Sequence, residues 1–226
     1  MRVDIITCLP KLLESPCSHF IFERAIAQKK LDLHIHDLRD YTPYKHGKID
    51  DYIYGGEAGM LLMIAPIANC INTLKAKNNY EDVIYMAPDG ELFDQKTANQ
   101  LSIQGNLIIL CGHYKGIDER IRAHFITREI SIGNYVLSGG ELPAIIMLDA
   151  VVRLIPGVMS DMTSALADSF QNNLLAPPAY TRPANFQGLE VPPILYSGDH
   201  KAIQKWNHDQ ALARTKVRRP EILEKE

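Results

Sequence analysis

Several features that identify common classes of protein are missing from this 226-residue sequence. It contains no run of about 18 apolar residues, so no segment reads as a transmembrane helix. Its start, MRVDIITCLP, lacks the basic and apolar regions of a secretory signal, and we expect a cytoplasmic protein with no membrane partner. The four cysteines form no C-x-x-C pair and no cluster with zinc spacing, so we expect reduced, buried thiols and no metal site.

Two nucleotide-binding motifs are also absent, because the chain has neither a G-x-G nor a G-x-x-x-x-G-K-[ST] sequence. The net charge of −3 gives no general attraction to nucleic acid. The end of the chain is nevertheless basic, and only Asp209 opposes its cations Lys201, Lys205, Arg214, Lys216, Arg218 and Arg219. Such a stripe can bind phosphates, but it can also be a solvated helix face.

What the first 157 residues contain is an alternation of strand-like and helix-like segments. We expect strands at 3–7, 31–38, 83–87, 107–111 and 126–130. We expect helices at 11–29, 66–77, 94–104, 117–124 and 141–156. This alternation predicts an α/β fold with a mostly parallel sheet that helices cover on both faces.

The pattern changes after Gly157. Residues 158–178 are small, polar and non-periodic, which predicts a linker or a lid. Residues 179–226 contain short turns and then a helix near 200–213. The sequence therefore predicts a large domain over 1–157, a linker over 158–178 and a small, mainly helical domain over 179–226.

Glycines gather in three loops, at 54–59, 111–120 and 131–143. Glycine lets a backbone approach a ligand closely, and parallel sheets bind ligands beyond the carboxyl ends of their strands. Because two of these loops follow predicted strands, they could wall one cofactor pocket. Tight structural turns would explain each loop equally well.

These loops belong to an ordered series: IDDYIYGGEAGMLLM, CGHYKGIDER, SIGNYVLSGGELPA, RLIPG, DSF, YTRP, VPPILYSGDH and RTKVRRPE. The series resembles the bacterial tRNA (guanine-N1)-methyltransferases over nearly the whole chain. The resemblance implies a SPOUT-class sheet with a deep trefoil knot, a flexible linker and a small domain that binds tRNA. It further implies a homodimer with its active site at the subunit interface. The implied reaction moves a methyl group from S-adenosyl-L-methionine to N1 of guanosine 37 in tRNA, and the family also suggests a Mg²⁺ ion.

The resemblance assigns roles to individual residues. Cofactor binding falls to Pro88, Gly112, Tyr114, Gly116, Ile132, Gly133, Tyr135, Leu137, Gly139, Gly140 and Pro143. Asp168 matches the general base and Arg153 the cation near the target guanine. The hairpin that contains Asp50, Gly55 and Gly59 is implied to lie near tRNA. From the basic stripe, we add as candidate phosphate contacts Arg214, Lys216, Arg218 and Arg219.

The chemistry suits these roles. Guanine N1 holds a proton at neutral pH, so a carboxylate such as Asp168 must accept it before N1 can attack. The negative charge that then develops on O6 can be stabilised by the donor fork of Arg153. Simpler alternatives remain, because Asp168 could cap a following helical turn and Arg153 could complement a helix dipole.

Two positions depart from the family pattern. Glu57 stands where a third glycine is usual, and Lys115 stands where an acid is usual, one thought to face the cofactor's amino end or the substrate. We expect Asp118, Glu119 or Glu57 to compensate, or the acid to be dispensable. Alternative functions are a knotted methyltransferase that acts on another RNA target, a non-catalytic RNA-binding module, and a structural protein without a ligand.

Overall fold

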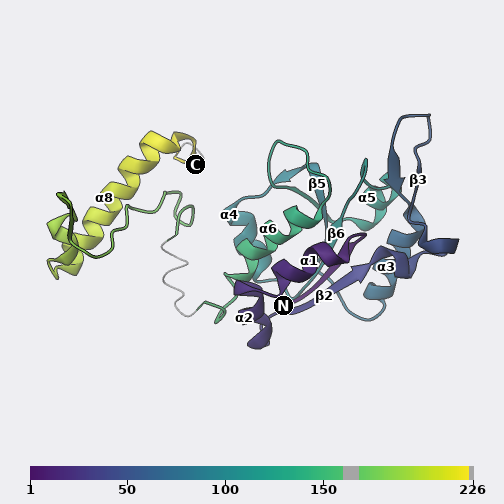
Figure 1. Ribbon diagram of the computed structural model, residues 1–226, viewed down its shortest axis with the longest axis horizontal. Coiled ribbons are helices and arrows are strands. Elements are labelled where there is room, and N and C mark those ends of the chain that lie inside the picture. Colours follow the sequence, from purple (N-terminus) through teal and green to yellow (C-terminus); the bar gives the residue numbers. More distant parts are fainter. Residues whose placement is uncertain (160–167, 224–226) are drawn as a thin grey trace. The chain divides into compact units, whose positions relative to one another are not determined.

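The computed structural model describes residues 1–159 and 168–223. The chain divides into two compact units, Met1–Ser160 and Asp161–Glu226 (Figure 1). No helix in the described part of the chain is long and apolar enough to cross a membrane.

A five-stranded parallel sheet forms the centre of the first unit, in the order β2-β1-β6-β5-β7. Its strands are β1 (Arg2–Thr7), β2 (Asp32–Asp37), β5 (Asp82–Leu92), β6 (Asn106–Cys111) and β7 (Arg128–Ser131). Each lies within a few residues of a predicted strand, although β5 is longer than predicted. The predicted parallel sheet is confirmed.

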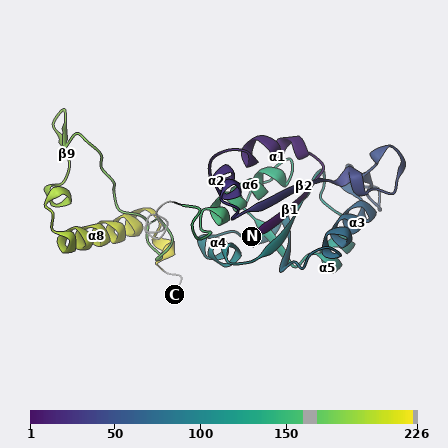
Figure 2. The same ribbon diagram turned by 90° about the horizontal axis from the view of Figure 1, so that it is seen from below.

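Helices cover both faces of this sheet (Figure 2). One face packs against α1 (Pro10–Cys17), α2 (Phe20–Ala27), α4 (Gln95–Ser102) and α6 (Glu141–Val152). The other packs against α3 (Ile64–Lys75) and α5 (Glu119–Phe125). Side chains alternate between the two layers along each strand, so that Ile109 joins the first core and Ile108 the second. Both layers are apolar, which explains why the strands read as almost continuous hydrophobic runs.

Two predicted helices differ from the structure. The expected helix at 11–29 is broken between α1 and α2, where Phe20 takes a left-handed φ of 53°. The expected helix at 141–156 ends at Val152. Pro156 accounts for the early end, because a proline disfavours helical geometry in the residue before it and cannot donate a helical hydrogen bond.

A buried carboxylate fixes the edge of the sheet beside β2. Asp4, on β1, has no exposed surface and accepts hydrogen bonds from Arg2 Nε (2.8 Å) and Tyr80 Oη (2.8 Å). Its Oδ1 also lies 2.8 Å from His36 Nε2 on β2. Burial alone would raise the pKa of Asp4, but the hydrogen bonds from His36, Arg2 and Tyr80 outweigh it and lower that pKa to about 2.

A short hairpin precedes α3 in the chain, and the glycine loop at 54–59 joins its two strands, β3 (Asp50–Tyr52) and β4 (Met60–Leu62). The hairpin is joined to the loop after β6, because Lys115 N donates to Met60 O (3.1 Å) and Leu62 N donates to Gly116 O (3.1 Å). The predicted tRNA-binding hairpin and a predicted cofactor loop are therefore neighbours.

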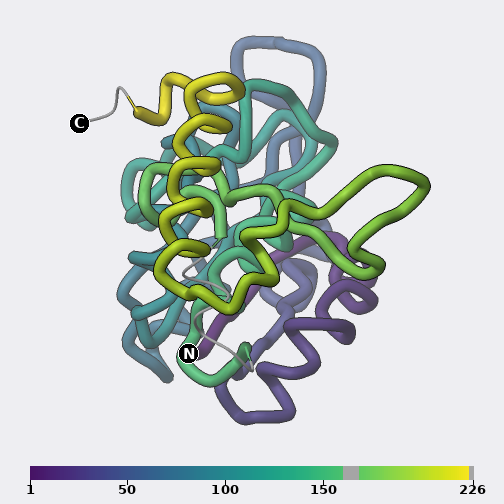
Figure 3. Tube along the Cα trace, turned by 90° about the vertical axis from the view of Figure 1, so that its left-hand side faces the viewer, coloured from purple at the N-terminus to yellow at the C-terminus, as the bar shows by residue number. Residues whose placement is uncertain are grey.

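The second unit is built on α8 (His200–Arg218), with a small hairpin of β8 (Asn185–Phe186) and β9 (Leu189–Glu190) (Figure 3). Asp199 caps α8 by accepting from the backbone of Lys201 and Ala202, and the helix runs five residues beyond the predicted end at 213.

Part of the predicted linker is attached to α8. Leu175 N donates to the buried Thr215 Oγ1 (2.9 Å), and the Arg219 guanidinium lies 5.7 Å from the centre of the Phe170 ring. Residues 160–167 of the linker lie outside the described residues. The segment that carries Asp168 thus contacts the helix that carries the basic stripe.

Candidate active site

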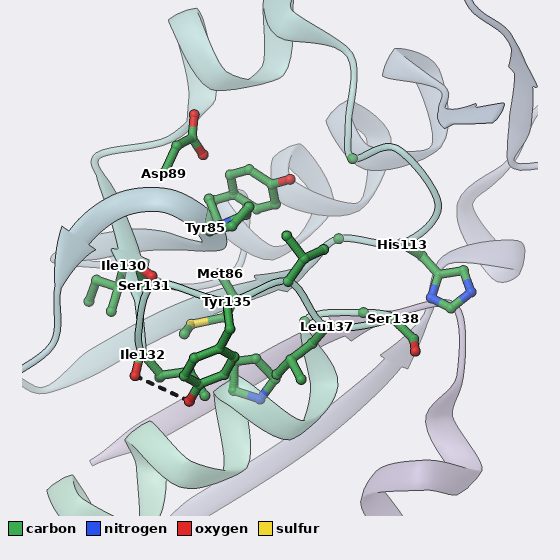
Figure 4. A pocket seen from close by; sticks show the side chains of 18 of the residues that line it. Tyr85, Met86, Asp89, His113, Ile130, Ser131, Ile132, Tyr135, Leu137 and Ser138 are labelled. Atoms are coloured by element: carbon green, nitrogen blue, oxygen red, sulfur yellow. Dashed lines mark hydrogen bonds between the residues drawn. The ribbon is translucent and has the colours of Figure 1, made fainter. Parts of the chain in front are cut away.

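A cavity of about 360 Å³ lies at the carboxyl ends of β5, β6 and β7 (Figure 4). Three segments line it, at 85–89, 112–116 and 130–140, together with Pro143 at the start of α6. Arg122 of α5 completes the wall. Every residue that the family resemblance assigns to cofactor binding lies in this lining. The structure therefore brings together residues that are up to 55 positions apart, from Pro88 to Pro143.

A bulge in β5 produces one wall of the cavity. Met86 and Glu91 both pair with Ile130 of β7, so the four residues between them stand out from the ladder. This places Pro88 and Asp89 at the cavity. Because a Cβ on Gly90 would lie 2.5 Å from the backbone carbon of Glu129, only glycine allows the strand to return to its neighbour there.

The loops after β6 and β7 pack directly on each other. Gly140 N donates to Gly112 O at 2.8 Å. A Cβ on Gly140 would lie 2.8 Å from Cys111 Cα, and one on Gly112 would lie 2.9 Å from the Tyr85 ring. Real Cβ atoms do not approach so closely, so these glycines are required for the two loops to form one wall.

The wall formed by the loop after β7 is mainly apolar. Leu137, Val136 and Pro143 line it, and the Tyr135 ring lies against Gly133. Figure 4 shows the hydrogen bond from Tyr135 Oη to Ile132 O, which is 3.4 Å long. Apolar side chains interleaved with backbone carbonyls and amides suit a flat heterocycle that is recognised through its polar edge.

The opposite side of the cavity is charged. Arg122 donates to Asp89 Oδ2 at 2.8 Å and also pairs with Glu129. Its guanidinium carbon lies 5.6 Å from the centre of the Tyr85 ring. The hydrogen bond from Arg122 lowers the pKa of Asp89, so this carboxylate is ionised at neutral pH.

Neither Asp89 nor Arg122 was among the site residues predicted from the sequence. The sequence did contain a signal, since MAPDG places a carboxylate and a glycine directly after a buried strand. The three acids that were predicted to compensate for Lys115 do not line the cavity. Asp118 begins α5 and pairs with Arg120 (2.7 Å), while Glu119 and Glu57 are exposed.

Glu141 is a buried carboxylate beside the cavity. It is 1% exposed and accepts a hydrogen bond from Thr7 Oγ1 at 2.7 Å. Its oxygens lie within 4.8 Å of the Cys8 sulfur and a ring nitrogen of His113, and this is the one such cluster among the described residues. Burial raises the pKa of Cys8 to about 11, so Cys8 is a thiol at neutral pH. This mixed donor set does not suit Mg²⁺, which prefers oxygen ligands.

The two predicted catalytic residues lie in different units. Arg153 follows the last residue of α6, whose first turn borders the cavity. A helix of 12 residues is roughly 18 Å long, so Arg153 lies far from the cavity of its own chain. Asp168 lies in the second unit, where residues 169–174 form turns and bends. Both simpler alternatives stay open, because Asp168 directly precedes a turn and Arg153 directly follows α6.

The predicted RNA contacts occupy two surfaces. In the first unit, Gly55 and Gly59 have positive φ values of 96° and 113° in the exposed tip of the hairpin, and Asp50 is half-buried in β3. In the second unit, Arg214 and Arg218 line a hollow of about 430 Å³ together with Ser169.

The remaining two candidate phosphate contacts differ from each other. Lys216 is exposed on α8. Arg219 pairs with Glu221 and lies over Phe170, so part of its donor capacity is already used within the unit.

Comparison with known proteins places this site in context. A family model described as tRNA (Guanine-1)-methyltransferase TrmD matches residues 1–225. The tRNA (guanine-N(1)-)-methyltransferase of Cytophaga hutchinsonii is 60% identical over 225 residues, which cover 100% of this chain and 96% of the relative. The enzymes of that name from Flavobacterium johnsoniae and Bacteroides fragilis are each 58% identical over 224 residues. Those residues cover 99% of this chain and 99% and 100% of the two relatives.

Proposed function

Because the chain belongs to the tRNA (guanine-1)-methyltransferase family, we propose that it methylates N1 of guanosine 37 in tRNA, beside the anticodon. The methyl donor is S-adenosyl-L-methionine. The observation that carries this proposal is that every residue assigned to the cofactor by the family pattern lines one cavity. Its volume of about 360 Å³ lies within the range of about 300–1,000 Å³ that is usual for small-molecule sites.

The donor fits the residues that line the cavity. The apolar wall around Leu137 and Pro143 suits adenine, and the carbonyl of Ile132 can accept a hydrogen bond from its amino group. When bound, the donor supplies a methyl group on a positively charged sulfur, which is a good leaving group. The task of the protein is then to hold that methyl in line with N1 and to make N1 nucleophilic.

Asp168 and Arg153 carry out the proton transfer in this proposal. The Asp168 carboxylate accepts the proton from N1, and the Arg153 guanidinium stabilises the charge that moves to O6. Loss of one such preorganised donor commonly costs about 10²–10³ in rate. Since residues 169–176 are bonded to one another and to α8, a tRNA that binds the arginines of α8 also positions the base.

The position of Arg153 supports a homodimer with shared active sites. It lies at the far end of α6 from the cavity, so a guanine above the cavity of one chain needs the arginine of another. The exposed face of α6 is largely apolar, because Leu142 and Ile146 are 50% and 52% exposed and share it with Asp149. A second copy that packs there covers these side chains and brings its own Arg153 to the site.

Mixing two inactive variants tests the shared site. Arg153→Ala lacks the cation, and Gly140→Val lacks room for the packed cofactor loops. If dimers exchange freely, half of them are mixed and each mixed dimer has one intact site of two. The mixture then regains about one quarter of wild-type activity. No recovery, although pull-down through a tag on one variant recovers the other variant as mixed dimers, would mean that each chain uses its own Arg153.

The remaining parts of the proposal concern the knot, the metal and the location. The packing of the loop at 132–140 on the loop at 112–116 supports the deep trefoil knot of SPOUT-class enzymes. A Mg²⁺ requirement stays a prediction to which we assign no residue, and titration with EDTA tests it. Cytoplasmic location is expected from the tRNA substrate.

Methyl transfer to defined transcripts tests the function. Wild-type protein with labelled S-adenosyl-L-methionine should methylate a tRNA transcript with guanosine at position 37 and not the matched transcript with adenosine there. The alternative of another RNA target predicts the same low labelling of both transcripts. A ribose methyltransferase needs no base at N1, so an Asp168→Asn variant that kept full activity would favour that alternative.

A further inference from the structure

Charge is distributed unevenly around the cavity. The wall contributed by the loop after β7 is apolar, while Asp89, Lys115 and Arg122 line the remainder. Figure 4 shows Asp89 beside Tyr85, on the side of the cavity opposite Ile132 and Tyr135. One part of the cavity is thus suited to an uncharged ring and the other to a charged group.

S-adenosylmethionine has the same division. Its adenosine half is uncharged, and its amino-acid tail carries an ammonium and a carboxylate. A site that distinguishes this tail needs one acid and one base, because an unpaired charge that leaves water is costly.

Asp89 is the one acid that lines the cavity among the described residues. Its side chain remains 60% exposed although it pairs with Arg122. Arg122 is shared, since it also pairs with Glu129 and lies 3.9 Å from Glu119. Because carboxylates outnumber the guanidinium in this cluster, Asp89 keeps negative charge for a second cation.

Lys115 is the base that remains. It is exposed at the cavity, and no described residue forms an ion pair with it. Its aliphatic chain is held in place, because its Cγ and Cε lie 2.9 Å and 3.3 Å from where a Cβ on Gly59 would be. The backbone of Lys115 is fixed by its hydrogen bond to Met60 O. Packing of the aliphatic chain and the backbone hydrogen bond therefore restrict where the Lys115 ammonium can lie.

We infer that Asp89 and Lys115 recognise the amino-acid tail of the methyl donor, with Asp89 binding its ammonium and Lys115 its carboxylate. This inference rests on the proposed function. It explains why a lysine is tolerated at position 115: the acid of the site stands on the bulge of β5 instead. Asp89 and Lys115 are then specificity residues that touch the cofactor without taking part in methyl transfer.

Binding of three related ligands to the full-length chain tests this assignment by calorimetry. The ligands share an uncharged sulfur, so that only the tail differs: S-adenosylhomocysteine has both charges of the tail, its decarboxylated form lacks the carboxylate, and 5′-methylthioadenosine lacks the tail. Asp89→Asn should weaken binding of the first two about 10- to 100-fold, as expected for loss of a charge-assisted hydrogen bond, and leave the third within about twofold. Lys115→Met, which keeps the stem, should weaken only the first.

The controls separate recognition from folding. Glu91→Gln removes an exposed acid on β5 that pairs with Arg128 and does not line the cavity, and it should bind all three ligands like the wild type. Equal loss of all three ligands in Asp89→Asn, or no loss of any, would overturn the inference. If the wild type binds 5′-methylthioadenosine and S-adenosylhomocysteine equally, the tail is not recognised and the inference also fails. No binding of S-adenosylmethionine to the wild type would instead contradict the proposed function itself.

Discussion

Thr7 joins the end of β1 to the start of α6, and replacing it with valine tests how the cavity is held together. Its hydroxyl donates to Glu141 Oε1 (2.7 Å) and accepts from Leu9 N (2.8 Å). Thr7 and Glu141 are each 1% exposed, so water cannot replace the bond between them. Valine keeps the shape of threonine and removes both interactions, which leaves a buried acceptor on Glu141 and the Leu9 amide without this partner.

The magnitude follows from these two bonds. A buried acceptor that loses its hydrogen-bond partner costs about 1–3 kcal/mol, and the lost bond to the Leu9 amide adds about 1 kcal/mol. We therefore expect Thr7→Val to lower the free energy of unfolding by about 2–4 kcal/mol. For a domain of this size, each kcal/mol lowers the melting temperature by about 2–4 °C, so the change is on the order of 10 °C.

Urea titration and thermal melting measure this effect, and Thr7→Ser is the matched control because it keeps the hydroxyl. Because Glu141 follows the glycines that wall the cavity, Thr7→Val should also bind S-adenosylmethionine more weakly than Thr7→Ser. If Thr7→Val and Thr7→Ser melt within about 1 °C of each other, the buried bond does not support α6 and the reasoning is wrong.

Three further predictions follow. The fold lowers the pKa of Asp4 from 3.8 to about 2, so ionised Asp4 contributes about 2 kcal/mol to stability above about pH 4, and this contribution is lost as the pH falls toward 2. Asp4→Asn should therefore destabilise the chain at pH 7 and make the free energy of unfolding depend less on pH between 4 and 2. Gly140→Ala sets a Cβ against the backbone of Cys111 and should cost about 1–3 kcal/mol of stability and most of the affinity for S-adenosylmethionine, as melting and calorimetry with and without the ligand will measure. Replacing Arg214 and Arg218 with glutamine should weaken tRNA binding and reduce the slope of log affinity against log salt by about 1 to 2, whereas an unchanged slope would exclude phosphate contacts by both side chains.

The sequence was sufficient to predict the parallel sheet, because short apolar runs such as β1 and β6 alternate with segments of helical periodicity. It also indicated the loops that line the cavity, since glycines such as Gly112 and Gly140 occur directly after a strand or before a helix. These features are local, and local patterns of hydrophobicity and glycine are what a sequence displays directly.

The features that the sequence did not reveal depend on long-range contacts. The β5 bulge results from pairing with β7, and it alone brings Asp89 to the cavity. The break between α1 and α2 lies within a continuous amphipathic pattern, and only Pro16 hinted at it. The distance of Arg153 from the cavity of its own chain depends on where α6 lies, since this helix starts at the cavity and ends just before Arg153.

The attachment of Asp168 to the second unit was likewise invisible in the sequence. The segment from 158 to 178 reads as a polar linker, yet Leu175 and Phe170 contact α8. Its anchoring side chain, Thr215, lies 40 residues away from Leu175 and has no distinctive pattern around it. This contact links the proposed base to the arginines proposed to bind tRNA.

The most direct test of the account is to identify the methylated nucleoside. An unmodified tRNA with guanosine at position 37 is incubated with S-adenosyl-L-methionine and the wild-type chain, digested, and analysed by mass spectrometry against nucleoside standards. The account predicts 1-methylguanosine at position 37, and a loss of at least 100-fold in its rate of formation in Asp168→Ala that still binds the donor. A 2′-O-methylated nucleoside, methylation at another position, or a fully active Asp168→Ala would contradict it.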